Sequence, residues 1–281
     1  MGGGKTIAER PLERFGAFIE RGRGWESVQA AAGMWSVGIQ TLRELARWPL
    51  AWIPDAVVET SVIFRRTLFP VFVSVAVFIG ASGVFTLGKV IQVLGAPDRQ
   101  AGGIFVGSLR EVATWVTMMI FAGVAGSAVT ADLGARKIRE ELDALAVLGV
   151  PAVRSLVAPR VAAFTFSAVV LGGFGLLAIM FTDYLLVPPV YHLSGGVFFD
   201  SVKQNILTTD VYATIIKHAI IGFCIGVVCC VKGLQAKGGA EGVGRAVNEA
   251  VVISFFLVWA INSIYNLAYL SLFPEVSVLK G

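Results

Sequence analysis

The sequence predicts an all-α integral membrane protein, with an N-terminal interfacial amphipathic helix followed by five transmembrane helices. The 281 residues are 56% hydrophobic and only 15% charged, and their mean hydropathy of +0.77 exceeds that of most water-soluble domains. Five apolar runs are long enough to cross the bilayer hydrocarbon, which takes roughly 20 residues. The runs are continuous and rich in Gly and Ala, as in packed membrane helices, whereas a membrane barrel shows short segments of alternating polarity.

The N-terminal segment, residues 1–66, is predicted to be cytoplasmic and to precede a membrane domain at residues 67–281. It contains no apolar signal-peptide core and no small-residue cleavage site. Apolar residues recur at three- and four-residue steps from Val28 to Ala46, which indicates an amphipathic helix. Because indole rings favour the headgroup level, tryptophans in this segment place the helix in the cytoplasmic interface, although it could instead pack on another subunit. These tryptophans are Trp25, Trp35, Trp48 and Trp52.

The distribution of basic residues predicts how the spans are oriented. Seventeen of the 23 lysines and arginines precede the first span or lie at residues 136–160 and 232–245. Basic residues accumulate on the cytoplasmic side of a membrane, so the N-terminus is predicted to be cytoplasmic and the C-terminus external. The five predicted spans are residues 68–94, 104–131, 155–186, 211–231 and 246–273.

Small and polar residues inside the spans predict contacts between helices. Gly222 and Gly226 form a Gly-x-x-x-Gly pair that allows close helix approach. Asn262 and Asn266, four residues apart in the last span, are expected to donate hydrogen bonds across a helix or dimer interface. The external segment at residues 184–209 is expected to form a short lid or a docking surface.

Several kinds of site are excluded by the residues available. Gly4-Lys5-Thr6 resembles the end of a phosphate-binding loop, but the required first glycine and the preceding strand are missing. The three cysteines all lie in the fourth span without metal-ligand spacing, and the chain has only two histidines. We therefore expect no metal, no cofactor and no catalytic residue in this chain, which is predicted not to be an enzyme.

Three charged residues within the spans are candidates for a substrate cavity. Arg110 and Glu111 lie about seven residues, or roughly 10 Å, inside the external end of the second span. Lys217 lies at a similar depth in the fourth. Such charges are costly in a membrane and usually face a cavity or a partner. Glu111 is placed to bridge Arg110 and Lys217, and the alternative is an ion pair that only locks two helices.

The loop between the second and third spans is predicted to contain a short amphipathic helix. Ile138, Leu142 and Leu145 recur at helical spacing, and Gly149 with Pro151 ends the helix. From composition alone, a helix of this kind is expected to be a solvated connector between two spans. Polar residues occupy its other faces: Arg136, Glu140 and Asp143.

Two blocks of sequence resemble the MlaE/YrbE family of permeases, including the actinobacterial YrbE-like members that work with Mce proteins. The first block covers residues 121–134, continues as Glu140-Glu141-Leu142-Asp143-Ala144-Leu145, and ends at Gly149-Val150-Pro151 and Pro159-Arg160. The second covers residues 238–247. Leu109-Arg110-Glu111 and Lys217 match residues that the family places at the wall of an outward-open lipid cavity. The chain departs from the family pattern at Val124, often an arginine, and at Ala113-Thr114, often Gly-Pro.

This resemblance implies the membrane-spanning subunit of an Mce-type ABC transporter that moves lipids of the phospholipid, fatty acid or sterol class. The implied partners are a second permease subunit, identical or paralogous, two cytoplasmic ABC ATPase subunits that bind ATP and Mg, and external Mce-domain proteins, with no nucleic acid. The implied location is the bacterial inner (plasma) membrane. The loop helix would be the coupling helix, with Ile138, Leu142 and Leu145 docking on the ATPase.

In the same resemblance Arg136, Glu140 and Asp143 would make polar contacts with the ATPase.

The rival class is a secondary transporter or channel for a hydrophobic solute. Such proteins usually show an inverted repeat and broken helices, and neither pattern is visible in this sequence.

Overall fold

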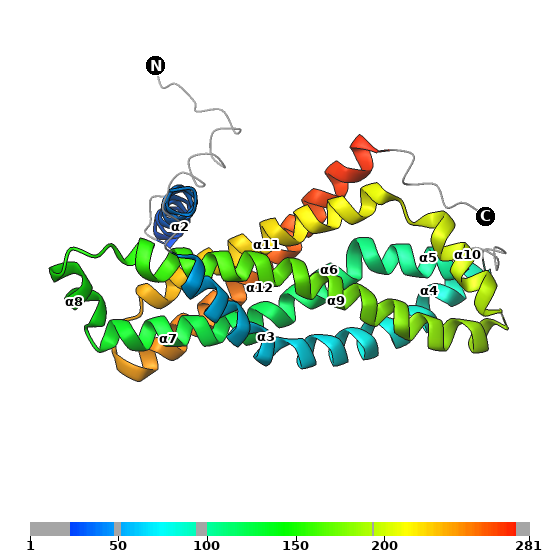
Figure 1. The fold of residues 1–281 in the computed structure, drawn as a ribbon, viewed down its shortest axis with the longest axis horizontal. Coiled ribbons are helices and arrows are strands. Elements are labelled where there is room, and N and C mark those ends of the chain that lie inside the picture. Colours follow the sequence, from blue (N-terminus) through cyan, green and yellow to red (C-terminus); the bar gives the residue numbers. More distant parts are fainter. Residues whose placement is uncertain (1–22, 48–51, 94–99, 193, 274–281) are drawn as a thin grey trace, which may run out of the picture.

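The computed structural model describes residues 23–47, 52–93, 100–192 and 194–273, and every regular element in these ranges is helical. The long helices lie alongside one another in an elongated bundle, with the short helix α8 at one end and α10 at the other (Figure 1). This arrangement confirms the predicted all-α class and the predicted number of spans. The five helices that are long and apolar enough to cross a membrane are Ile53–Val90, Gly102–Ile138, Val153–Tyr191, Thr208–Leu234 and Gly239–Leu272.

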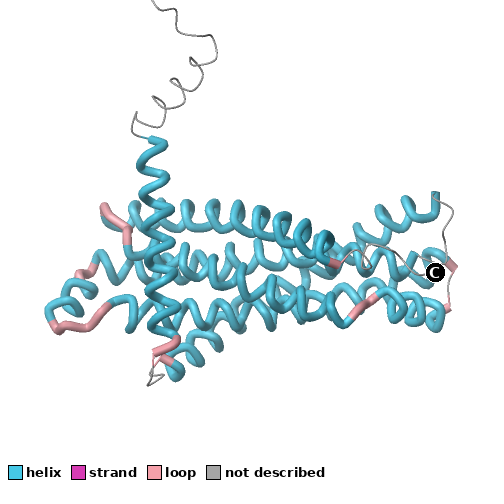
Figure 2. The backbone as a smooth tube through the Cα atoms, turned by 90° about the horizontal axis from the view of Figure 1, so that it is seen from above, coloured by secondary structure: helices cyan, strands magenta, loops and turns pink. Residues whose placement is uncertain are grey.

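Helix α2 (Arg23–Leu45) lies across the α8 end of the bundle rather than along it (Figures 1 and 2). Its Trp35 and Leu42 side chains are exposed, whereas Gly38 and Thr41 are buried. This is the two-faced character that the sequence predicted, and the crossed orientation suits a helix lying in the membrane interface. Residues 48–51 are outside the described ranges, so the expectation for Trp48 lies outside them. The expectation for the side chain of Trp25 also lies outside what the structure describes.

The first span begins well before the predicted residue 68. It consists of α3 (Ile53–Val75), the π-helical segment η1 (Ala76–Ala81) and α4 (Ser82–Val93). Arg65 and Arg66 interrupt the apolar run in sequence, but both are exposed on the helix surface and leave its backbone intact. Long basic side chains can extend along a helix to reach water, so the helix continues through the predicted boundary at residue 66.

The second span is divided by two π-helical segments. It runs through α5 (Gln100–Gly107), η3 (Ser108–Val112), α6 (Ala113–Phe121), η4 (Ala122–Gly126) and α7 (Ser127–Ile138). A π-helical turn widens the hydrogen-bond ladder and is frequent at functional sites. The position of η3 is therefore of interest, because it contains both Arg110 and Glu111.

The remaining spans contain few interruptions. The short helix α8 (Glu141–Val147) is followed by η5 (Val153–Val157), α9 (Ala158–Tyr191), α10 (Gly195–Asn205), α11 (Thr208–Leu234) and α12 (Gly239–Leu272). The segment predicted as a lid is mostly helical, since α9 continues through its two prolines and α10 follows after a short turn. The backbone N–H of Gly102 donates to the Ser201 hydroxyl at 3.0 Å, which holds α10 against α5.

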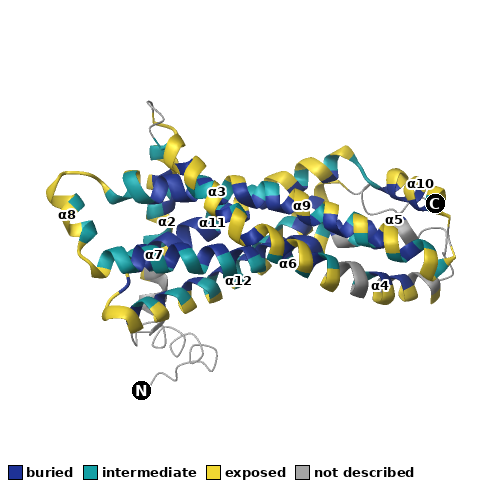
Figure 3. Ribbon diagram, turned by 60° about the horizontal axis from the view of Figure 1, so that its bottom comes forward, coloured by how far each residue is buried: buried dark blue, intermediate teal, exposed yellow. Residues whose placement is uncertain are grey.

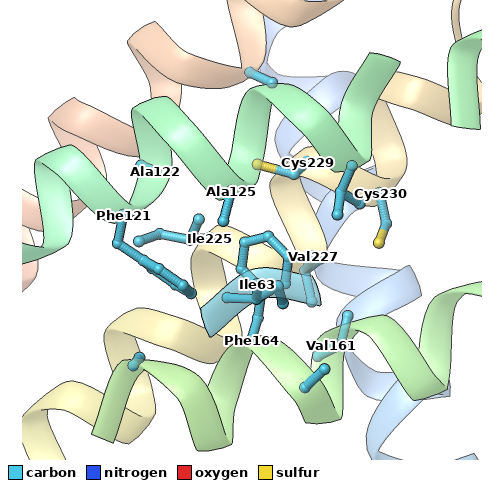
Figure 4. Close-up of a cluster of buried hydrophobic side chains, with 14 of the residues drawn as sticks. Ile63, Phe121, Ala122, Ala125, Val161, Phe164, Ile225, Val227, Cys229 and Cys230 are labelled. Carbon is cyan, nitrogen blue, oxygen red and sulfur yellow. The ribbon is translucent and has the colours of Figure 1, made fainter. Parts of the chain in front are cut away.

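Buried residues line the inner faces of the helices, while apolar residues on the outer faces are exposed (Figure 3). One apolar cluster contains residues from all five spans (Figure 4). Within it the rings of Phe121 and Phe164 have centroids 5.0 Å apart. Cys229 and Cys230 are buried in the same cluster, as expected for cysteines that serve as small packing residues.

The Gly-x-x-x-Gly pair brings α11 close to α9, as predicted. A Cβ atom built at Gly222 would lie 2.4 Å from the Ala168 Cβ and 2.8 Å from the Phe164 carbonyl oxygen, and one at Gly226 would lie 3.2 Å from the Val161 Cα. Real Cβ atoms essentially never approach as closely as the one at Gly222 would, and the distance at Gly226 is tighter than most, so these glycines permit the contact.

We expect Gly222→Ala to lower the free energy of unfolding by about 1–3 kcal/mol, because the added methyl group forces α9 and α11 apart. The matched control is Gly173→Ala on α9, where a Cβ meets nothing within 4 Å. Thermal unfolding of the two purified variants checks this. Equal melting temperatures would contradict the close packing.

Candidate functional site

The π-helical segment η3 brings three spans together at one backbone carbonyl. The Arg110 carbonyl oxygen accepts hydrogen bonds from Lys217 Nζ at 2.6 Å and from Asn266 Nδ2 at 2.9 Å. A π-helical turn disturbs the regular ladder and leaves such a carbonyl available to other donors. Lys217 Nζ also donates to Asn266 Oδ1 at 3.1 Å. The second, fourth and fifth spans are therefore joined at this point, and Asn266 makes the cross-helix contact that its spacing predicted.

The guanidinium of Arg110 pairs with Asp210, a residue that sequence reasoning missed. Arg110 Nε lies 2.9 Å from Asp210 Oδ1, and Nη2 lies 3.1 Å from Oδ2, which is the two-pronged geometry that makes Arg–carboxylate pairs strong. The Asp210 side chain is 0% exposed. It also accepts from the Tyr269 hydroxyl at 2.9 Å and from the Leu207 backbone N–H at 3.1 Å.

The sequence did contain a signal for Asp210. It precedes Lys217 by seven residues, which is two helical turns, so the two side chains share a face of α11. The predicted fourth span begins at residue 211, so Asp210 lies just outside it. In the structure Asp210 lies in the first turn of α11, where the helix dipole also stabilises a carboxylate.

Glu111 contacts a residue other than the predicted ones. Its Oε2 accepts from Asn262 Nδ2 at 2.9 Å, and the residue as a whole is exposed. Among the described residues no ion pair joins Glu111 to Lys217, so the predicted bridge is absent there. The reason is that Lys217 turns to the Arg110 carbonyl and Asn266, while Asp210 takes the guanidinium of Arg110.

A pocket of about 310 Å³ opens between α5, η3 and α12, next to this network. Arg110 and Glu111 line it, as predicted for a cavity. Lys217 does not, because it is 2% exposed and lies behind the pocket wall. Apolar groups form most of the remaining surface, so the pocket combines a polar end with apolar walls, as small-molecule sites usually do. Its lining residues are Gly103, Val106, Gly107, Arg110, Glu111, Asn266, Tyr269 and Leu270.

The helix predicted in the loop after the second span is present but begins later than expected. Helix α7 ends at Ile138, and Glu140 takes a left-handed conformation with φ of 60° before α8 begins at Glu141. Ile138 therefore belongs to α7, and the single face predicted for it with Leu142 and Leu145 is divided by this turn. Leu142 and Leu145 lie one turn apart on α8, where both are partly buried.

The end of α8 follows the predicted stop signal. Gly149 has a φ of 71°, and its N–H donates to the Ala146 carbonyl at 3.0 Å while Val150 N–H donates to the Leu145 carbonyl at 2.9 Å. This is the Schellman arrangement that a glycine after a helix favours. It leaves Val147 and Leu148 87% and 75% exposed, so the most exposed apolar groups at this end of the helix are not the three that were expected to dock on the ATPase.

A series of ion pairs connects α8 with the spans beneath it. Lys137 pairs with Asp143 at 3.0 Å. Arg136 lies 3.7 Å from Glu141 and 3.1 Å from Asp132. These pairs are partly exposed and each contributes little energy, but together they orient α8 on α7. The predicted polar residues Arg136 and Asp143 thus have partners within this chain, while Glu140 is the exposed residue at the turn.

The buried Arg160 of α9 forms ion pairs with residues of two other helices. Its Nη2 lies 2.8 Å from Asp132 of α7 and 3.0 Å from Glu59 of α3, and its side chain is 7% exposed. Asp132 therefore contacts both Arg136 and Arg160. A displacement of α8 can in this way reach the ends of three spans.

The five apolar spans define a multi-pass membrane protein. The family described as Permease MlaE matches residues 58–268. The chain therefore belongs to the MlaE permease family, as its two sequence blocks predicted.

Similar proteins carry names of the same kind. The probable ABC transporter permease protein slr1045 of Synechocystis is 30% identical over 66% of this chain and 70% of its own. A probable ABC transporter permease of Rickettsia typhi is 30% identical over 72% of this chain and 80% of its own. The chloroplastic protein TRIGALACTOSYLDIACYLGLYCEROL 1 of Arabidopsis thaliana is 33% identical over 56% of this chain and 45% of its own.

Proposed function

We propose that this permease is the membrane-spanning subunit of an ABC transporter that moves lipids across the cell envelope. The observation that carries the proposal is the pocket of about 310 Å³, whose apolar walls meet a polar end formed by Arg110 and Glu111. A lipid has the same division between acyl or ring carbons and a polar group. The galactolipid in the name of the Arabidopsis relative supports a lipid substrate for this chain.

The power for transport would come from separate subunits. We expect two cytoplasmic ATPases to bind ATP and Mg, a second permease subunit to complete the cavity, and Mce-domain proteins to receive or deliver lipid outside. The relatives named as ABC transporter permeases support the ATPase partner. Helix α8 is the expected coupling helix, because its exposed Val147 and Leu148 offer an apolar contact that water does not favour.

In this mechanism ATP-driven movement of the ATPases tilts α8. The ion pairs of Arg136, Asp132 and Arg160 pass the movement to α7, α9 and α3. Rigid helices shift by small sliding and rotation against one another, and the second span contains the η3 segment at its other end. The tilt would therefore change the width of the pocket and release the lipid held there.

The proposed location is the bacterial inner membrane, with α8 in the cytoplasm and α10 outside. We expect a cysteine at Ala146 to react with a membrane-impermeant maleimide only after the cell is opened, and one at Gly196 to react on intact cells. Both positions are exposed. The unmodified chain is the control for the three native cysteines, of which Cys229 and Cys230 are buried and Cys224 is partly buried. Labelling of Ala146→Cys on intact cells would reverse the orientation.

Glu111→Gln tests the proposed lipid site. Hydrogen bonds to a charged group contribute about 1.5–3 kcal/mol, so lipid-stimulated ATP hydrolysis at limiting lipid is expected to fall about tenfold or more. The melting temperature should change little, because the pocket is open and Glu111 is exposed. If Glu111 only locks helices together, the stability will fall and the lipid dependence will remain.

The control for this test is Glu241→Gln, which removes the same charge from an exposed side chain near the start of α12, far along the bundle from the pocket. Both readouts should stay at the wild-type level in this variant. A Glu111→Gln transporter with normal stability and normal lipid stimulation would remove Glu111 from the functional site.

A further inference from the structure

The charged side chains around the pocket differ in how far they are exposed at its surface. Arg110 and Lys217 carry positive charge, and Glu111 and Asp210 carry negative charge, so the formal charges of the four cancel. The two cations differ from Glu111 in their engagement: Arg110 lines the pocket, but its side chain is only 16% exposed and Asp210 holds its guanidinium by two contacts. Lys217 Nζ lies on the Arg110 carbonyl and Asn266, behind the pocket wall. The Lys217 residue is 2% exposed, and it is absent from the pocket lining.

Glu111 is the ionised group that the pocket presents to a ligand. It is exposed and lines the pocket, and one of its oxygens is held by Asn262. The Asn262 NH₂ must face this carboxylate, because a carboxylate accepts and does not donate. The Asn262 Oδ1 then has no donor in the described part of the chain, although Asn262 is 2% exposed.

We propose that this pocket selects lipids whose polar group donates hydrogen bonds and carries no net negative charge, such as a hydroxyl or an ammonium group. A donor placed on Glu111 forms a charge-assisted hydrogen bond, which is stronger than one between neutral groups. A phosphate monoester or carboxylate would instead approach a like charge, with the nearby guanidinium already paired. This inference rests on the proposed lipid-transport function and defines its substrate class.

Three dioleoyl lipids with the same acyl chains test the inference: diacylglycerol with its hydroxyl, phosphatidylethanolamine with its ammonium, and phosphatidic acid with its phosphate monoester. Each is titrated into the assembled transporter in neutral detergent, and binding is measured by native mass spectrometry. We expect phosphatidic acid to bind at least about tenfold more weakly than the other two, which corresponds to about 1.4 kcal/mol. Glu111→Gln should reduce the difference to about threefold or less, while Glu241→Gln should preserve the wild-type ratio.

A second variant is expected to change the binding of phosphatidic acid in the opposite direction. Asp210→Asn removes the carboxylate charge that holds the guanidinium of Arg110, so phosphatidic acid should bind this variant more tightly than it binds the wild type. If the variant does not assemble, the Glu111→Gln comparison still decides the question. A wild-type preference for phosphatidic acid, or a difference of less than tenfold, overturns the proposed selectivity and leaves lipid transport in place. Failure of all three lipids to bind overturns the proposed function itself.

Discussion

The double substitution Val147→Asp and Leu148→Asp is expected to release the ATPase from this permease. The two side chains are 87% and 75% exposed at the end of α8, and an apolar surface of this kind gains free energy by entering a groove of a partner. Burying an unpaired carboxylate in its place costs several kcal/mol. Since each 1.4 kcal/mol is a factor of ten in affinity, we expect a loss of about a hundredfold or more.

Copurification of the ATPase with tagged permease measures this loss. The permease itself should fold and insert normally, because no residue of α8 is buried. The matched control is Gln235→Asp, which adds a carboxylate at the exposed end of α11 and outside α8. A double variant that retains its ATPase at the wild-type yield would show that α8 is not the docking helix.

Hydropathy predicted the spans well because the bilayer imposes one requirement on every one of them. The ends were harder to predict, since a helix can continue beyond its apolar run when charged side chains lie on its surface. Arg65 and Arg66 illustrate this within the first span. The turn at Glu140 was also missed, because spacing alone cannot reveal a residue with positive φ that divides a helix. Gly149 was recognised because glycine is the residue that most easily takes that conformation.

The sequence predicted the charged residues of the site but not the contacts between them. Charges inside a membrane stand out in the sequence, so Arg110, Glu111 and Lys217 were found. Their partners were not, because a contact between the second and fourth spans depends on helix rotation and on the η3 segment. Asp210 was missed because the predicted fourth span begins one residue later, although the first turn of a span is a favourable position for a buried carboxylate.

Asp210→Ala is expected to have the largest effect on stability among single substitutions in the pocket network. It removes the partner of Arg110 and an acceptor for Tyr269 and Leu207. Breaking one side of a buried ion pair costs about 3–5 kcal/mol, because the remaining charge loses the carboxylate that compensated it. The free energy of unfolding in mixed micelles should fall by that amount. Asp200→Ala, which removes an exposed carboxylate from α10, should leave it unchanged.

A double substitution separates the ion pair from the rest of the network. Arg110→Met with Asp210→Leu replaces both charges by apolar groups, and such replacements are often neutral or stabilising. We expect this variant to be more stable than Asp210→Ala alone, although Tyr269 still lacks its acceptor. It should also lose lipid-stimulated ATP hydrolysis, because the polar end of the pocket has lost its guanidinium. If Asp210→Ala is as stable as the wild type, the Arg110–Asp210 pair does not hold the second and fourth spans together.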